Sequence, residues 1–346
     1  MRRIFFLCAL SIGIYAVAFG LLVDRPLSLG LLRLEISKKT AMLAALPSPK
    51  FVILAGSNGP YSHSCTVIGA MLSLPCENAG IAVGIGLDDI FARYAPLLHR
   101  GDIIYVPMEL QQYTATRAQY RSSADGGFLF RHDRGVLAEL PADRILGAVF
   151  CCNLSDFLES LAEMPMARSG AISPDRLLAI EYNAQGDRID NNLADADPAL
   201  LHHPLRPMPN VQEITRGYGA FLIARFVAQE SSRGITVIGG LPSDFAGAAL
   251  SPEIINALAS IYTTHGGAFM VLPNHSLYPV QDFFNGEDHL ARPCQYLHSI
   301  AVAYHLAPLL NRPLQPPAKA TESFAQTCPS SGAVLLNHGK SEQPVR

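Results

Sequence analysis

Short uninterrupted apolar runs alternate along most of the chain with longer segments whose apolar residues recur at helical spacing. The short runs, each closed by a glycine, a proline or a polar residue, predict buried strands at Phe51–Ala55, Asp102–Pro107, Ile235–Ile238 and Ala268–Leu272. The periodic segments predict helices over residues 62–73, 87–99, 211–231, 251–264 and 290–310. Strands that alternate with helices form a parallel sheet covered on both faces, so the pattern predicts an α/β fold.

Two regions depart from this alternation. Residues 111–210 follow no regular pattern and contain a Pro- and His-rich segment, so we expect an insertion over the sheet with a helix near 155–163. The Pro-, Ser- and Ala-rich end of the chain predicts disorder over 313–346. The α/β domain is therefore expected to occupy residues 51–312.

The amino terminus has a different pattern, since Ile4–Val23 is a 20-residue apolar run without a charge. At about 1.5 Å per residue, a helix of this length spans about 30 Å, the thickness of the hydrocarbon core of a bilayer. We predict that residues 1–23 form a membrane anchor and that residues 24–50 form a stem. A signal peptide cleaved after Ala16–Ala18 is one alternative. A helix buried in the core of a globular domain is the other.

Basic residues lie on both sides of this run, so the positive-inside rule does not decide its orientation. Arg2 and Arg3 before an apolar run form the pattern of an exported protein. We therefore expect a single-pass inner-membrane protein with its domain in the periplasm or another extracytoplasmic space.

Composition narrows the chemistry. With 26 Lys and Arg against 29 Asp and Glu, the chain lacks the basic excess that nucleic-acid binding requires. No lysine lies between Lys50 and Lys319, which excludes a P-loop or a Schiff-base lysine in that interval. The seven cysteines show no metal-ligand spacing, so we expect neither metal nor cofactor. Cys65 and Cys76 flank one predicted helix, where a disulfide is one option.

Ligands of a parallel sheet bind beyond the carboxyl ends of its strands. This rule selects four positions, namely Ser57–Asn58, Glu109, Ser243–Asp244 and Asn274–His275. Ser57 lies on a tight strand-to-helix turn that suits a nucleophile, although Ser57 or Asn58 could equally cap the helix. Glu109 either contacts substrate or caps a helix or pairs with an arginine.

A serine nucleophile needs a base, and His289 is the best-placed histidine. It opens the closing helix directly after the loop of the last strand, and so returns to the edge of the sheet that carries Ser57. The other histidines lie in the insertion, in helices or in other less suitable segments.

Four blocks of sequence resemble the SGNH/GDSL hydrolase superfamily, in particular its membrane-anchored members associated with bacterial exopolysaccharide and cell-envelope acylation. These blocks are Val52–Asn58, Asn78–Gly80, Gly101–Glu109 and Phe283–Leu290. The resemblance implies a flavodoxin-like three-layer α/β/α sandwich with a parallel sheet. It also implies that Ser57 is the nucleophile, that the Gly80 amide stabilises the oxyanion and that His289 is the base.

The chain departs from the family pattern at three places. Gly56 precedes the serine where the family commonly has Asp, and Pro107–Glu109 replaces the Gly-x-Asn block, which leaves Asn58 as a substitute oxyanion donor. The family's Asp, three or four residues before the histidine, is also missing. Asn285, Asp288 and Asp282 are the candidates that could orient His289.

These residues predict a serine-dependent acyl esterase or O-acyltransferase acting on an extracytoplasmic polysaccharide or cell-envelope glycan. Its partners would be an acylated polysaccharide or acyl donor, the membrane, and other envelope-assembly proteins. The sequence does not separate hydrolysis from transfer, because both pass through the same acyl-enzyme. The alternative is a catalytically inactive assembly or polysaccharide-binding subunit on the same fold.

Overall fold

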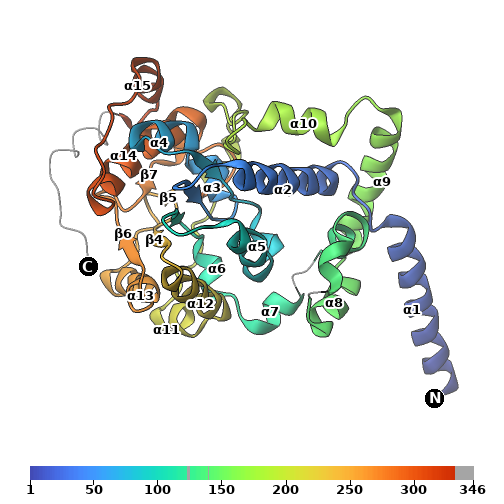
Figure 1. The fold of residues 1–346 in the computed structure, drawn as a ribbon. Helices are drawn as coiled ribbons and strands as arrows, with labels where there is room; N and C mark the ends of the chain where they lie inside the picture. Colours follow the sequence, from blue (N-terminus) through green and yellow to red (C-terminus); the bar gives the residue numbers. More distant parts are fainter. Residues whose placement is uncertain (123–124, 139, 332–346) are drawn as a thin grey trace. The chain divides into compact units, whose positions relative to one another are not determined.

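The computed structural model describes residues 1–122, 125–138 and 140–331 (Figure 1). The chain divides into two compact units. The N-terminal unit comprises residues 1–37, 84–86 and 118–180, and the sheet unit comprises residues 38–83, 87–117 and 181 onward.

A five-stranded parallel sheet forms the centre of the sheet unit, with the strand order β2-β1-β3-β4-β6. Its strands are β1 (Phe51–Ile53), β2 (Cys76–Asn78), β3 (Ile103–Val106), β4 (Thr236–Gly240) and β6 (Ala268–Met270). This order is that of flavodoxin-like sheets, whose direction of winding reverses between the first and third strands. The prediction of an α/β fold with a parallel sheet is confirmed. Two short strands that the sequence pattern did not indicate, β5 (Asp244–Phe245) and β7 (Leu277–Tyr278), pair in parallel as a separate sheet.

Helices lie in all five segments predicted to be helical, and three further helices, over residues 58–62, 110–114 and 319–325, were not indicated by the sequence pattern. The helices of the sheet unit are α3 (Asn58–Ser62), α4 (Cys65–Leu72), α5 (Leu87–Tyr94), α6 (Leu110–Thr114), α11 (Val211–Arg216), α12 (Tyr218–Ser232), α13 (Pro252–Thr263), α14 (Arg292–Leu309) and α15 (Lys319–Ala325). The remaining α-helices are α1 (Arg2–Leu22), α2 (Ser28–Ala45), α7 (Arg117–Ser122), α8 (Ala142–Val149), α9 (Leu154–Ser169) and α10 (Pro174–Glu181). Short 3₁₀ or π turns complete the described chain: η1 (Val83–Ile85), η2 (Ala95–Leu97), η3 (Phe128–His132), η4 (Arg134–Ala138), η5 (Leu193–Asp195), η6 (Pro198–His202) and η7 (Val280–Asp282).

Helices cover both faces of the sheet because successive strand residues point to opposite sides. Phe51, Ile53 and Tyr105 point to the face covered by α4 and α14, where they pack in one buried cluster with Ile68 and Val302. The opposite face contacts α12 and α13. There the ring of Phe269 packs against Tyr262 of α13, with ring centroids 5.4 Å apart.

The irregular stretch and the stem are divided between the two units. Residues 118–180 of the expected insertion cluster with residues 1–37 in the N-terminal unit, and residues 111–117 and 181–210 belong to the sheet unit. Residues 38–50 of the expected stem belong to the sheet unit, where Leu43 and Lys50 are fully buried. Helix α1 is long and apolar enough to cross a membrane, and none of its residues is buried.

Three disulfides link six of the seven cysteines: Cys65–Cys76, Cys151–Cys152 and Cys294–Cys328. The bond from Cys294 in α14 to Cys328 fixes a segment that the composition suggested to be disordered. Residues 313–331 instead include helix α15, and residues 332–346 of the expected tail lie outside the described residues.

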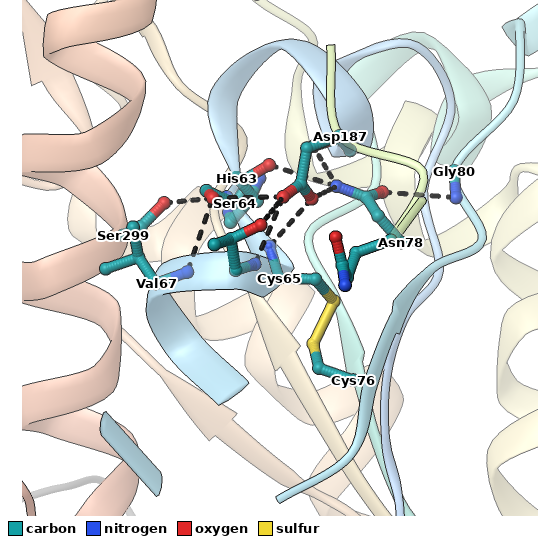
Figure 2. Close-up of a disulfide and its surroundings, with 12 residues drawn as sticks. His63, Ser64, Cys65, Val67, Cys76, Asn78, Gly80, Asp187 and Ser299 are labelled. Atoms are coloured by element: carbon teal, nitrogen blue, oxygen red, sulfur yellow. Dashed lines mark hydrogen bonds between the residues drawn. A yellow bond between two sulfur atoms is a disulfide. The ribbon is translucent and has the colours of Figure 1, made fainter. Parts of the chain in front are cut away.

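Asp187, from the irregular stretch, joins the start of α4 to the end of β2 (Figure 2). Its buried carboxylate accepts hydrogen bonds from Cys65 N, Thr66 N, Ser64 Oγ, Thr66 Oγ1, Asn78 Nδ2 and Asn183 Nδ2. Two of these donors are amides in the first turn of a helix, which have no partner within the helix. Asp187 therefore acts as a helix cap supplied by a distant segment.

We predict that Asp187→Ala lowers the free energy of unfolding by about 2–4 kcal/mol, because several buried donors lose their acceptor together. The control Asp195→Ala removes an exposed carboxylate that accepts a single side-chain bond, from Asn192, and should change stability by less than about 0.5 kcal/mol. Denaturant unfolding of both variants measures the difference. Equal stability of the two variants would contradict this role of Asp187.

Candidate active site

The candidate site lies at the carboxyl ends of β1 and β3, where the winding of the sheet reverses. Open parallel sheets bind ligands at this position, because the loops on either side diverge there. Ser57 follows β1, and Glu109 follows β3. The residues predicted from the strand-end rule thus share one edge of the sheet.

Ser57 is the N-cap residue of α3, but its hydroxyl makes no capping bond. It is the half-buried member of an otherwise buried segment, residues 51–60. Across the described residues, neither its hydroxyl nor its backbone amide has a hydrogen-bond partner. The serine therefore offers an uncommitted hydroxyl and an uncommitted amide at one position.

The carboxyl group of Glu109 fixes the turn around Ser57. Its Oε2 accepts from Gly56 N at 2.9 Å, and its Oε1 accepts from Asn58 N at 2.8 Å. Burial raises the pKa of Glu109 to about 8, with a smaller contribution from the nearby Asp288. At neutral pH this carboxyl group therefore favours its protonated, uncharged form. The structure assigns Glu109 a cap-like role toward the turn.

Asn58 is fully buried and joins three strand ends. Its Nδ2 donates to Pro107 O after β3, and its Oδ1 accepts from the amide and the hydroxyl of Ser243 after β4. The side chain suggested as a substitute oxyanion donor is thus engaged in connecting the loops that surround Ser57.

Gly80 lies directly against the Ser57 turn. A Cβ atom at this position would lie 2.9 Å from Gly56 O and 3.0 Å from the Cα of Gly59, so no larger residue fits without displacing backbone. Its amide makes one long bond, 3.4 Å, to Asn78 Oδ1, and its carbonyl accepts from Lys39 Nζ at 2.5 Å. The Ser57 amide is therefore unbound within the described residues, and the Gly80 amide is only weakly bound.

His289 lies on a tight loop that Asn285 stabilises. Its Nδ1 is 2.7 Å from Asn285 Oδ1, and because that oxygen only accepts, Nδ1 carries the proton. The imidazole stacks on the ring of Tyr61, with centroids 3.9 Å apart and an angle of 14° between the planes. Of the three candidates for orienting His289, Asn285 is the one that contacts Nδ1.

The other ring nitrogen of His289 is available. Nε2 is buried and has no hydrogen-bond partner among the described residues, and Asp288 Oδ1 lies 3.7 Å from it. Burial lowers the pKa of His289, against an opposing effect of Asp288, with Arg188 and Arg206 lowering it further. The imidazole is therefore neutral at neutral pH, with a lone pair on Nε2 that can accept a proton.

Two buried hydroxyl groups connect the histidine loop to the serine helix. Ser62 Oγ, at the end of α3, lies 2.6 Å from Ser243 Oγ and donates to Asp288 O at 2.8 Å. Leu290 N donates back to Ser62 Oγ at 3.3 Å. The residues on either side of His289 are thus bonded to the helix that Ser57 begins.

A buried chain of two imidazoles supports the same helix. Because Asn58 O can only accept, His63 Nδ1 donates to it, and His63 Nε2 must then accept from His298 Nε2 at 3.1 Å. His298 Nδ1 in turn accepts from Tyr278 OH at 2.8 Å. Burial lowers the pKa of His63 to about 4, so this chain stays neutral and structural.

Sequence reasoning missed Tyr61 and Ser62, which contact the histidine loop from α3. Both lie at the start of the predicted helix or directly before it, where the local pattern gives no signal for a contact 228 residues away in the chain. Ser243 was selected by the strand-end rule but received no role. In the described part of the chain, one group of potential metal ligands occurs, namely Asp282, Cys294 and Cys328, and its two cysteines form a disulfide.

Comparisons of the chain with protein-family models, with curated proteins and with solved structures find no significant match. The similarity to SGNH/GDSL hydrolases therefore remains a prediction from four sequence blocks. Any function proposed for the chain therefore rests on the geometry of Ser57, Gly80, Asn285 and His289.

We predict that Glu109→Gln flattens the pH dependence of stability. Because the folded-state pKa of Glu109 lies near 8, above its ordinary value of 4.5, the folded state binds more protons than the unfolded state between these values. This contribution to stability is complete below pH 4.5 and is lost as the pH rises through 8.

Thermal unfolding at pH 5, 6.5 and 8 measures this effect, and the variant should lose less stability with rising pH than the wild type. Glu77 and Asp244, whose pKa values burial raises to about 8 and about 7, contribute the same sign to both proteins. Glu322→Gln, at an exposed position, is the control and should keep the wild-type slope. Parallel slopes for wild type and Glu109→Gln would show that Glu109 is ionised throughout.

Proposed function

We propose that this protein is a serine-dependent acyl esterase or O-acyltransferase, with Ser57 as the nucleophile and His289 as the base. The observation that carries the proposal is the state of His289. Asn285 binds its Nδ1, its Nε2 has no partner in the described chain, and the hydroxyl of Ser62 connects its loop to the Ser57 helix. A neutral imidazole oriented in this way is what a serine nucleophile requires.

In this mechanism His289 Nε2 takes the proton of Ser57 Oγ as the oxygen attacks the acyl carbonyl. The tetrahedral oxyanion accepts hydrogen bonds from the amides of Ser57 and Gly80. The imidazolium then protonates the leaving oxygen, which leaves an acyl-serine. The carboxylate of Asp288, 3.7 Å from Nε2, stabilises the positive charge while it lasts.

Deacylation repeats these steps with a second nucleophile. His289 removes a proton from the incoming oxygen, which attacks the acyl-serine, and Ser57 leaves with that proton. Water as the acceptor gives hydrolysis, and a sugar hydroxyl gives acyl transfer. Both reactions use the same residues, so the proposal includes both.

The substrate class follows from the resemblance and the location. The apolar helix α1 supports a single-pass inner-membrane anchor, and three disulfides support an oxidising, extracytoplasmic environment for the domain. An acylated polysaccharide or cell-envelope glycan is a substrate found there. Neither cofactor nor metal takes part in the proposed steps.

A catalytically inactive assembly or glycan-binding subunit is the second candidate. Two observations favour it: no hydrogen bond joins Ser57 Oγ to His289 within the described chain, and the Gly56 and Asn58 amides of the turn are committed to Glu109. Under this assignment the same sheet edge would bind a glycan without attacking it.

Ser57→Ala is expected to abolish both hydrolysis of an acetyl-ester substrate and covalent labelling by a fluorophosphonate. The hydroxyl is the atom that both reactions modify, so no residual labelling should remain. Ser260→Ala, which removes an exposed hydroxyl on α13, is the matched control and should label like the wild type. Retained turnover in Ser57→Ala would refute the proposal, and a wild-type protein that resists the probe but binds polysaccharide would favour the second candidate.

Asn285 variants test how His289 is oriented. Asn285→Ala should reduce kcat by about 10²- to 10⁴-fold with little change in KM, since disturbing the group that fixes the catalytic tautomer has effects of this size. Burial holds the pKa of His289 below 6.5, so the acid limb of wild-type kcat/KM should lie below that pH. Asn285→Asp places a negative charge at Nδ1, which raises this pKa and should move the acid limb to higher pH. An unchanged pH profile in Asn285→Asp would exclude His289 as the titrating base.

A further inference from the structure

In the N-terminal unit, helix α9 turns its polar face toward the rest of this unit and its apolar face outward. A helix on the surface of a water-soluble protein has the opposite arrangement. On α9, the carboxylates of Asp156, Glu159 and Glu163 point to the segment after α1, where Arg25 binds the first two at 2.9 and 3.0 Å. Glu163 accepts from the amides of Leu27 and Ser28. The polar face of α9 is thus satisfied within the protein.

The apolar face of α9 is uncovered. Leu154, Leu158 and Leu161, spaced four and three residues apart, are 73%, 56% and 52% exposed. Leu146 of α8 and Phe150, which follows α8, are 60% and 64% exposed. Several exposed apolar side chains of this size on neighbouring segments indicate a surface that is not in contact with water.

Contacts with α1 fix where this surface lies. The Tyr15 hydroxyl donates to Val149 O at 2.9 Å, and the Tyr15 ring packs against Phe150 and Phe157, with centroids 5.9 and 6.1 Å away. Tyr15 lies seven residues before Leu22, the last residue of α1, which is about 10 Å along the helix axis. If α1 crosses a bilayer, the junction of α8 and α9 lies about 10 Å below the surface of the hydrocarbon.

We propose that α8 and α9 form a membrane-embedded hairpin that enters one leaflet beside α1, with lipid acyl chains against Leu146, Phe150, Leu154, Leu158 and Leu161. The two helices meet at a 71° bend across a short break, so together they can enter and leave one leaflet. The salt bridges of Arg25 to Asp156 and Glu159 lie on the opposite face of α9, away from these leucines. This proposal rests on the assignment of α1 as a membrane anchor and does not depend on the chemistry of Ser57.

Lipids are the occupant that the structure favours, because the exposed face belongs to helices that pack against α1. Every residue of α1 from Arg2 to Ile14 is exposed, whereas Tyr15, Ala18, Phe19 and Leu22 form a half-buried stripe. Tyr15 contacts α8 and α9 from this stripe, so the three helices share one apolar surface. A second copy of the chain or another protein on this face would instead exclude lipid from it.

The experiment uses the absence of tryptophan from the chain. Leu158→Trp introduces a single fluorophore into the full-length protein, which is reconstituted in vesicles whose lipids carry bromine on their acyl chains. The hairpin predicts that this tryptophan emits at short wavelength and loses most of its fluorescence to the bromines. Leu154→Trp, nearer the bend, should behave in the same way.

Two control variants separate the premise from the proposal. Phe6→Trp, 65% exposed on α1, reports whether α1 lies in the bilayer, and Phe221→Trp, 55% exposed on α12, reports a surface in water. Quenching at positions 6 and 158 but not at 221 supports the hairpin. Quenching at position 6 alone overturns it, as does a short-wavelength emission at 158 without quenching, which indicates a protein partner. No quenching at position 6 removes the anchor and the hairpin together, while labelling of Ser57 is unaffected.

Discussion

The candidate site depends on the junction between two buried serine hydroxyls and one carbonyl. Ser62 and Ser243 come from different parts of the chain. Ser62 Oγ donates to Asp288 O and lies 2.6 Å from Ser243 Oγ. Through these contacts the loop of His289 is joined to the serine helix and to the end of β4. Buried hydroxyl groups are almost always hydrogen-bonded, and here each of the three segments provides hydrogen-bond partners for the other two. These hydrogen bonds fix the position of His289, the proposed base, relative to the helix that begins after Ser57.

Much of the architecture could be predicted from the sequence, because central parallel strands are apolar runs. β2 was missed since Cys76, Glu77 and Asn78 do not form such a run, and the strand is stabilised by a disulfide and by contacts to Asp187. Asn285 could be predicted as a partner of His289 because it lies four residues before it.

No local pattern indicated Tyr61 or Ser62, because their contacts with the His289 loop join segments that are distant in the sequence. The order of α15 depends on the pairing of Cys294 with Cys328, which spacing does not specify.

The segment between Lys50 and Lys319 contains no lysine, but two lysines from before it are buried in the sheet unit. Lys39 lies in α2, before this segment, and its ammonium donates to Gly80 O, the carbonyl of the glycine beside Ser57. Lys50 is likewise fully buried, and its ammonium donates to Leu43 O. The part of the expected stem that belongs to the sheet unit therefore contributes cations to its interior, and a truncation that starts at β1 would remove both.

The contact between Gly56 and Glu109 connects two positions at which the chain differs from the SGNH/GDSL pattern that four of its blocks resemble. A Cβ atom on Gly56 would lie 2.4 Å from Glu109 Oε1, so any side chain at position 56 would collide with this carboxyl group. SGNH-like blocks commonly carry an acidic residue at the position of Gly56. A chain with an acidic side chain at position 56 would therefore need a smaller residue than glutamate at position 109.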